Sequence, residues 1–188
     1  AGLVDHPVTR WSDLWDPALA GKVAIWRDTP REGIGMALKS LGYSANSEDP
    51  VELAAAQARL LELRTLVHFG EEWGTYTMVP AMMDGGTVVA GGYAYDARNL
   101  HDLDQPAEFV LPEEGALLWG DNFIVPAASQ RQADAMRLLN YLLRPEIGAQ
   151  IVEYTYIQLA NDAAVAALPD ALRNDPLLFV PAAQLRNA

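Results

Sequence analysis

Signals that start a helix recur along this chain and alternate with short runs of β-branched residues. Residues 29–32 (Thr-Pro-Arg-Glu) and 49–52 (Asp-Pro-Val-Glu) place a capping side chain, a proline and a glutamate in the order that begins a helix. Residues 129–132 (Ser-Gln-Arg-Gln) form a further capping box, and the runs at 22–26 and 87–91 are typical of strands. This alternation predicts an α/β fold with a mostly parallel sheet flanked by helices.

The spacing of apolar residues, glycines and prolines predicts the remaining elements. The first helix has an apolar stripe that ends at Leu41, and Gly42 follows where a left-handed C-terminal cap belongs. The second helix has its stripe at Leu53, Ala56, Leu60, Leu63 and Val67. A proline break at 144–145 separates two later helices, and the tail from Asn161 favours only short helical turns. Other helices are expected at 75–83 and 93–103, and short strands at 107–111, 116–119 and 122–125.

The balance of charge excludes one large class of partners. The 188-residue chain has 13 lysine and arginine residues against 25 aspartate and glutamate residues, a formal net charge of −12. Nucleic acid is bound by neutralising phosphates with basic side chains, so neither DNA nor RNA is an expected partner. No apolar run approaches the roughly 20 residues that span a bilayer. The lack of cysteine removes disulfides and thiolate chemistry.

Three segments should lie at the carboxyl ends of the predicted strands, where open parallel sheets bind ligands. They are residues 27–32, 91–96 and 119–121. Each offers carboxylates or aromatic rings. A pocket with both suits an organic ammonium ion, because carboxylates accept hydrogen bonds from N–H⁺ and ring faces attract cations. Taken singly, Glu32 is explained by helix capping, Trp119 by core packing and Asp121 by a turn.

Enzyme chemistry has little support in the sequence. The three histidines lie far apart, without a second ligand at metal-binding spacing. No nucleophile elbow, phosphate-binding loop or dinucleotide-binding glycine motif is present. One catalytic alternative is left open, a hydrolase that pairs Asp28 or Glu32 with Asp121. We predict no cofactor and no metal.

Several stretches, in a fixed order, resemble one family of proteins. The early stretches read Trp-Ser-Asp-Leu-Trp-Asp-Pro at 11–17, Gly-Lys-Val at 21–23, Pro-Arg-Glu at 30–32 and Leu-Lys-Ser-Leu-Gly-Tyr-Ser at 38–44. The later ones read Pro-Glu-Glu-Gly-Ala-Leu-Leu-Trp-Gly-Asp-Asn at 112–122, Asn-Tyr-Leu-Leu-Arg-Pro-Glu at 140–146 and Leu-Arg-Asn-Asp-Pro at 172–176. Together they resemble the spermidine/putrescine-binding family of bacterial ABC-transporter periplasmic solute-binding proteins.

The resemblance implies a receptor rather than an enzyme. Its fold would be that of the type II periplasmic binding proteins, in which two α/β lobes close on a polyamine or similar small cation. The receptor would then deliver this ligand to an ABC permease in the membrane. By the same resemblance Glu32 and Asp121 accept hydrogen bonds from ligand amines, and Trp119 lies against the ligand's methylenes.

Two departures from the family pattern concern the binding residues. Polyamine receptors commonly have a second acid at the place of Thr29, and here Asp28 stands one step earlier. Ala90 replaces a ligand-facing tryptophan of the second strand, and Tyr93 is the candidate to fill that place. Tyr93 and Tyr95 would point to opposite faces of a strand and would share no face of a helix, so one of them is expected in the core.

Family members begin with a whole lobe upstream of Trp11, so the resemblance implies the latter half of a receptor, with the first lobe largely missing. Residues 1–118 would form the second ligand-binding lobe. Residues 119–160 would form the crossover and a partial first-lobe strand-helix segment, and residues 161–188 a tail that returns to the second lobe. Such a fragment would bind ligand weakly. Its location would be periplasmic or extracellular, at the membrane-associated face, with the signal segment outside this chain.

The partial lobe has a consequence for association. The stripe formed by Met136, Leu139 and Leu143 would lose its usual sheet, so we expect self-association with a second copy, or cover by rearranged segments. Two alternatives to transport stay open on the sequence alone. One is an interaction or sensory module derived from the same lobe, and the other is the carboxylate-pair hydrolase.

Overall fold

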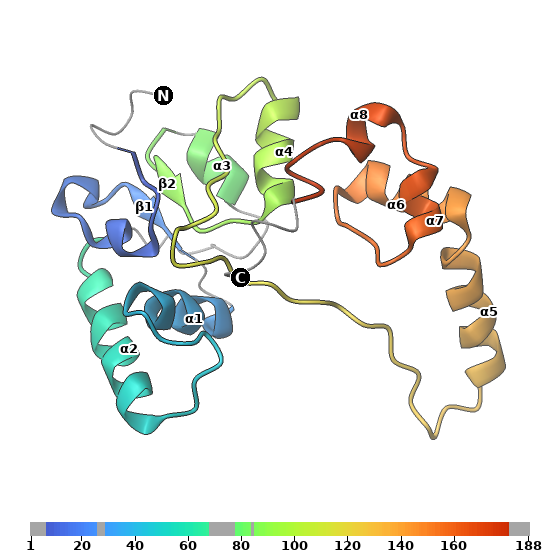
Figure 1. The fold of residues 1–188 in the computed structure, drawn as a ribbon, viewed down its shortest axis with the longest axis horizontal. Coiled ribbons are helices and arrows are strands. Elements are labelled where there is room, and N and C mark those ends of the chain that lie inside the picture. The colour runs from blue at the N-terminus through green and yellow to red at the C-terminus, as the bar shows by residue number, and fades with distance from the viewer. Residues whose placement is uncertain (1–6, 26–28, 68–77, 84, 181–188) are drawn as a thin grey trace. The chain divides into compact units, whose positions relative to one another are not determined.

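The computed structural model describes residues 7–25, 29–67, 78–83 and 85–180. It divides into two compact units, the first ending at Leu118 and the second beginning at Trp119, and each is described by itself (Figure 1). In order, the elements are the 3-10 helices η1 (Trp11–Trp15) and η2 (Pro17–Leu19), β1 (Val23–Ala24), α1 (Pro30–Ser40), α2 (Pro50–Leu63), α3 (Met78–Met83), β2 (Val89–Ala90), α4 (Ala94–Asp102), α5 (Gln132–Leu142), α6 (Pro145–Thr155), α7 (Asp162–Ala166) and α8 (Asp170–Arg173).

The first unit is built around two parallel strands. β1 pairs with β2 in a register that places Val23 beside Val89 and Ala24 beside Ala90. The first of these residues also forms a parallel bridge with Val67, which the apolar spacing had predicted as part of the second helix. That helix instead ends at Leu63, and the chain turns so that Val67 reaches the sheet. The predicted α/β fold with a parallel sheet is confirmed.

Apolar side chains from five elements cover these strands. α1 packs against α2, and η1 packs against both. The buried cluster around the strands consists of Leu14, Trp15, Leu19, Val23, Ala24, Ile25, Met36, Leu63, Val67, Met78 and Tyr93. β1 is fully enclosed, because Val23 and Ala24 have no exposed surface, whereas Val89 and Ala90 of β2 are half-buried. A short two-strand sheet is therefore stabilised by the helices that bury it.

The two proline-started helices begin in different ways. At α2 the Asp49 carboxylate accepts hydrogen bonds from the backbone N–H groups of Val51 at 2.7 Å and Glu52 at 3.4 Å, which is the predicted cap. At α1 the predicted capping box is wrong, because the Thr29 side chain makes no capping hydrogen bond. Thr29 has a ψ of 76°, outside the extended range of a normal N-cap residue. The left-handed residue after α1 is Gly42, with φ 80°, as predicted.

Several predicted strands do not form. Residues 107–111, 116–119 and 122–125 have no regular secondary structure, and no ladder of backbone hydrogen bonds joins them to another described segment. The start of α5 also differs from the prediction. Its first residue is Gln132, and the Ser129 hydroxyl accepts a hydrogen bond from the Arg131 N–H at 3.1 Å rather than capping a helix. An extended segment becomes a strand only where another strand pairs with it.

The second unit has a small core formed by α6 and the residues that follow it. Ala149, Val152, Leu168 and Leu178 form this core. α6 and α7 approach closely at Gly148, where an added Cβ would lie 2.6 Å from the Cβ of Ala164. The proline break before α6 and the short turns after residue 161 agree with the sequence. Whether residues 161–188 belong to the second lobe of a receptor stays a prediction.

Candidate functional site

The carboxyl ends of β1 and β2 bring two of the predicted ligand segments to one edge of the first unit. Because the strands are parallel and in register, the chain leaves both at the same side of the sheet. After β1 the chain reaches Thr29 and the start of α1, and after β2 it reaches Tyr93 and the start of α4. Asp28, a predicted binding residue, lies with residues 26 and 27 outside the described residues, so its role stays a prediction.

Glu32 lies in the first turn of α1 and is half-buried. The capping explanation for this residue is wrong, because its carboxylate makes no capping hydrogen bond to the backbone of Thr29. Within the described part of the chain the carboxylate has no hydrogen-bond partner. The hydroxyl oxygen of Thr29, the residue before α1, is buried and also has no hydrogen-bond partner there. Two polar side chains at the start of α1 thus have no partner among the described residues.

Tyr93 is the N-cap residue of α4 and is buried. Its backbone N–H donates a hydrogen bond to the Asp96 carboxylate at 2.8 Å. Its ring stacks on that of Tyr95, with centroids 5.2 Å apart and planes 19° apart. Tyr93 precedes α4 and Tyr95 lies within its first turn, so the case of two rings on opposite faces of a strand does not apply. The expectation that one ring joins the core is confirmed by Tyr93.

Asp96 is an acid at this edge that the sequence analysis did not select. It is 8% exposed. Burial raises its pKa to about 6, and the hydrogen bond from the Tyr93 N–H opposes this rise. The signal in the sequence is the spacing of Tyr93 and Asp96, since an acid three residues after an N-cap reaches back to the cap's N–H. Asp96 therefore has a structural role in starting α4.

Trp119 and Asp121 lie in the second unit. Trp119 is 52% exposed and Asp121 is also exposed. The neighbouring Asn122 side chain donates a hydrogen bond to the Gly120 carbonyl at 3.3 Å. The core-packing explanation for Trp119 is wrong, because about half of its surface is open to solvent. The candidate binding residues thus come from both units.

Glu114 fixes the segment that leads to Trp119 against the start of the first unit. Its carboxylate accepts hydrogen bonds from the backbone N–H groups of Trp11 at 3.0 Å and Ser12 at 3.2 Å. Burial alone would raise the pKa of Glu114, but backbone N–H groups and the nearby Arg10 guanidinium hold it below its usual value. The Trp11 indole also donates to the Gly115 carbonyl at 2.9 Å. These contacts position the end of the first unit.

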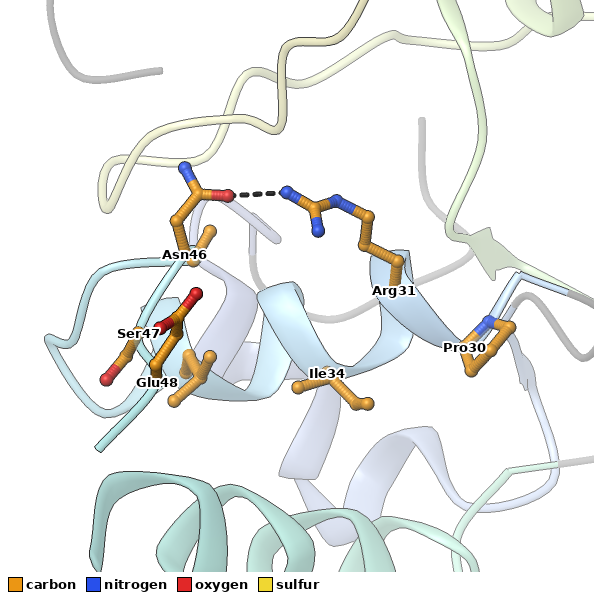
Figure 2. Close-up of a pocket in the computed structure, with 8 residues that line it drawn as sticks. Pro30, Arg31, Ile34, Asn46, Ser47 and Glu48 are labelled. Atoms are coloured by element: carbon orange, nitrogen blue, oxygen red, sulfur yellow. Dashed lines mark hydrogen bonds between the residues drawn. The ribbon is translucent and has the colours of Figure 1, made fainter. Parts of the chain in front are cut away.

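An open pocket of about 380 Å³ lies beside α1 (Figure 2). It is lined by Pro30, Arg31, Ile34, Leu38, Ala45, Asn46, Ser47 and Glu48. Figure 2 shows the Arg31 guanidinium reaching Asn46, to whose side-chain oxygen it donates a hydrogen bond of 2.6 Å. A pocket with one cation and one acid does not match the acid-rich site expected for an ammonium ligand.

Within the described ranges, no three histidine, aspartate or glutamate side chains gather as a metal ion would need. Among the helices that the structure describes, none combines the length and apolar character required to cross a membrane.

Comparison with known proteins defines the class to which the chain belongs. Residues 3–188 match the family described as bacterial extracellular solute-binding protein, and the chain belongs to this family. It is 33% identical over 181 residues to the spermidine/putrescine-binding periplasmic protein of Escherichia coli, a match that covers 96% of this chain and 51% of that protein. The chain therefore spans about half the length of the curated relatives it matches.

Solved structures agree with this assignment. The spermidine/putrescine ABC transporter substrate-binding protein of Streptococcus pneumoniae is 27% identical, with a TM-score of 0.76, and the match covers 97% of this chain and 55% of that one. A structure from Listeria monocytogenes, assigned to a spermidine/putrescine ABC transporter, is 29% identical with a TM-score of 0.84 over the same shares of the two chains. The predicted family resemblance is confirmed. The matched family and these proteins are described by binding and transport, not by catalysis.

Proposed function

We propose that this chain is part of the solute-binding component of an ABC importer for a polyamine or similar small organic cation. The observation that carries the proposal is the state of Glu32. This residue follows the proline and arginine of the family motif, and its half-buried carboxylate neither caps α1 nor has another partner among the described residues. A carboxylate held at the ligand edge without a structural partner is suited to an ammonium group.

The other candidate residues would each contact a different part of the ligand. Asp121 would accept a second N–H⁺ hydrogen bond, and the exposed indole of Trp119 would cover the methylenes between the amines. The unpartnered hydroxyl of Thr29 would accept a further N–H, with Asp28 beside it in the sequence. Tyr93 would act through its buried ring at the end of β2.

The proposal extends to partners and location. The relatives are named as periplasmic, and we propose a periplasmic or extracellular location and a membrane permease as the recipient of the ligand. Apolar side chains exposed between residues 118 and 143 also favour self-association of the isolated chain. Light scattering tests this part separately, and a strict monomer at all concentrations would contradict it.

A ligand panel tests the function directly. A ligand that binds only the folded state raises stability by RT ln(1 + [L]/Kd), about 2.7 kcal/mol at a hundredfold excess over Kd. We expect putrescine, cadaverine or spermidine at millimolar concentration to raise the Tm of the chain, with weak affinity because the 188 residues span about half the length of the relatives. Amino acids, sugars and phosphate should leave the Tm unchanged. A Tm rise with sugars or anions, and none with amines, would refute the ligand class.

Matched variants test the residues. Glu32→Gln and Asp121→Asn each remove one charge without changing size, and each should weaken amine binding about tenfold or more. Glu108→Gln in the first unit and Asp162→Asn in the second serve as controls, because both are exposed acids away from the proposed residues. Equal losses in the controls would assign the effect to the net charge of −12 rather than to a site.

The two alternative functions that the sequence left open have unequal support. Membership of a solute-binding family favours binding over the carboxylate-pair hydrolase. The exposed apolar segment of the second unit is the one observation that favours an interaction module instead of a transport receptor. A chain that fails to respond to any amine, yet captures a protein partner through this segment, would support that second function.

A further inference from the structure

Asp96 is a buried acid whose capping role does not require a charge. It lies in the first turn of α4 and is 8% exposed. One carboxylate oxygen accepts a hydrogen bond from the Tyr93 N–H at 2.8 Å, which starts the helix. An asparagine could accept the same bond without bringing a charge into a buried place. A buried acid where a neutral cap would serve is a candidate for recognition of a positive charge.

The charge of the Asp96 carboxylate is not balanced by a cation. Apart from the hydrogen bond from the Tyr93 N–H, the carboxylate makes no hydrogen bond or ion pair with any residue that the structure describes. Its pKa of about 6 reflects burial, which the Tyr93 N–H opposes, and no positive side chain contributes. A bound cation beside a carboxylate favours the charged form of that carboxylate. Such a cation would supply the stabilisation that the fold leaves out.

The elements around Asp96 bring no competing charge among the residues described. α3, which packs against α4, contains only methionine, valine, proline and alanine, and β2 is a valine and an alanine. The neighbouring rings at 93 and 95 are phenols, which are uncharged near neutral pH. Further along α4, Arg98 forms an ion pair with Asp102 at 3.1 Å, and the His101 ring lies 2.7 Å from the Ala107 carbonyl. The ionisation of Asp96 itself would therefore govern the binding of a cation at this place.

Gly92 leaves the carboxylate open to approach at the end of β2. A Cβ added at Gly92 would lie 3.3 Å from Oδ2 of Asp96, so a larger residue would crowd this oxygen. Gly92 is half-buried, which means that solvent reaches the same place. Because β1 and β2 are parallel and in register, the end of β2 lies at the sheet edge from which the chain also leaves β1 toward Glu32. Each strand is thus followed at this edge by an acid without a charged partner among the described residues.

We propose that the Asp96 carboxylate is a further binding residue for the organic ammonium ligand, and that it makes ligand affinity depend on pH. This inference rests on the proposed function and adds a recognition residue and a proton linkage to it. The ammonium group approaches over Gly92 and donates an N–H⁺ hydrogen bond to the carboxylate. Since the ligand binds the ionised carboxylate, binding releases a proton from the fraction of molecules in which Asp96 is protonated. Affinity is therefore highest at neutral pH and falls as the pH decreases.

Calorimetric titration of the full 188-residue chain with putrescine and with spermidine tests the inference. Alkylamines stay protonated between about pH 5 and pH 7, as lysine does, so the ligand's charge is constant. Affinity should fall about tenfold from about pH 7 to pH 5, because the ionised fraction of a group with a pKa of about 6 falls by that factor. At about pH 6, buffers of different ionisation enthalpy should show the release of about half a proton per ligand bound. Amine binding that is independent of pH and releases no proton would overturn the inference.

Asp96→Asn identifies the source of the proton. The variant keeps an oxygen for the Tyr93 N–H, so it should bind amine about tenfold more weakly than the parent at about pH 7, equally at pH 5, and without releasing a proton. Asp104→Asn, at an exposed residue in the turn after α4, is the control and should keep the affinity and pH profile of the parent.

The outcomes distinguish this inference from the proposed function. If Asp96 only caps α4, Asp96→Asn will bind amine as the parent does at every pH, and the inference is refuted while amine binding stands. If the parent binds no amine at any pH, the proposed function fails, and the inference fails with it. Equal losses in Asp96→Asn and Asp104→Asn would assign the effect to the net charge of the chain and would also refute the inference.

Discussion

The first unit and the opening segment of the second unit contain similar strand sequences with different outcomes. Residues 23–24 pair with residues 89–90, and the side chains of residues 23–24 are fully buried. Residues 122–125 also contain three consecutive apolar residues, yet they pair with nothing that the structure describes, and Phe123 and Ile124 are largely exposed. The difference shows that a β-rich sequence defines a capacity to pair, whereas the partner decides whether a strand exists.

The largest expected effect is the loss of stability when a buried leucine is replaced by alanine, and it tests the contrast between the two regions directly. Leu63→Ala should lower the free energy of unfolding by about 3 to 4 kcal/mol, because Leu63 is fully buried against the strands of the first unit. Leu138→Ala on α5 should change it by less than about 0.5 kcal/mol, because Leu138 is 57% exposed. Urea unfolding followed by circular dichroism measures both.

A second exposed leucine completes this test. Leu61 on α2 is also 57% exposed, so Leu61→Ala serves as the matched control in the first unit and should behave like Leu138→Ala. A large loss for Leu138→Ala alone would mean that α5 finds cover in solution, by self-association or otherwise. The concentration dependence of that loss would then identify association between copies.

The fold of the first unit could be predicted from the sequence because its signals are local. Asp49 caps α2 and Gly42 follows α1 in the left-handed conformation, and both depend on a few neighbouring residues. The absence of a cap at Thr29 could not be predicted, because burial of its hydroxyl oxygen is a tertiary property. Pairing of residues 122–125 could not be predicted either, because a strand depends on a partner that its local sequence does not reveal.

Part of the candidate site could also be predicted, because it depends on the order of elements along the chain. The positions of Glu32 and Tyr93 after strands follow from the order of elements. Asp96 was missed because an acid three residues into a helix is indistinguishable, by sequence, from an exposed capping residue. Its burial depends on how α4 packs on α3, which is a tertiary property.

The second expected effect is a pH dependence of stability, which reports on the burial of Asp96 at the sheet edge of the first unit. Asp96 has a folded-state pKa of about 6 against an ordinary value of 3.8, so the native state binds the proton more tightly than the unfolded state. The stabilisation from that proton is complete below about pH 4 and is lost as the pH rises through about 6. At about 1.4 kcal/mol for each pH unit of this difference, the loss is about 2 to 3 kcal/mol.

A neutral variant isolates this contribution. Asp96→Asn keeps an oxygen that accepts the Tyr93 N–H, so it should be about 2 to 3 kcal/mol more stable than the parent at pH 7 and equal to it at pH 4. Asp104→Asn, at an exposed residue in the turn after α4, should follow the parent at every pH. Denaturant midpoints across this pH range provide the measurement. Parallel pH profiles for Asp96→Asn and the parent would show that Asp96 is solvated.

The smallest effect compares two helix starts within the first unit. Asp49→Ala should lower the free energy of unfolding by about 1 kcal/mol, because the carboxylate satisfies two backbone N–H groups of α2. Thr29→Val should be neutral or slightly stabilising, since it replaces a buried hydroxyl without a described partner by a methyl group of the same shape. Thermal unfolding of both variants provides the test. A cost for Thr29→Val as large as that for Asp49→Ala would mean that the hydroxyl caps α1 in solution. With the expected order, the Thr29 hydroxyl contributes nothing to folding, which is consistent with its proposed role in ligand binding.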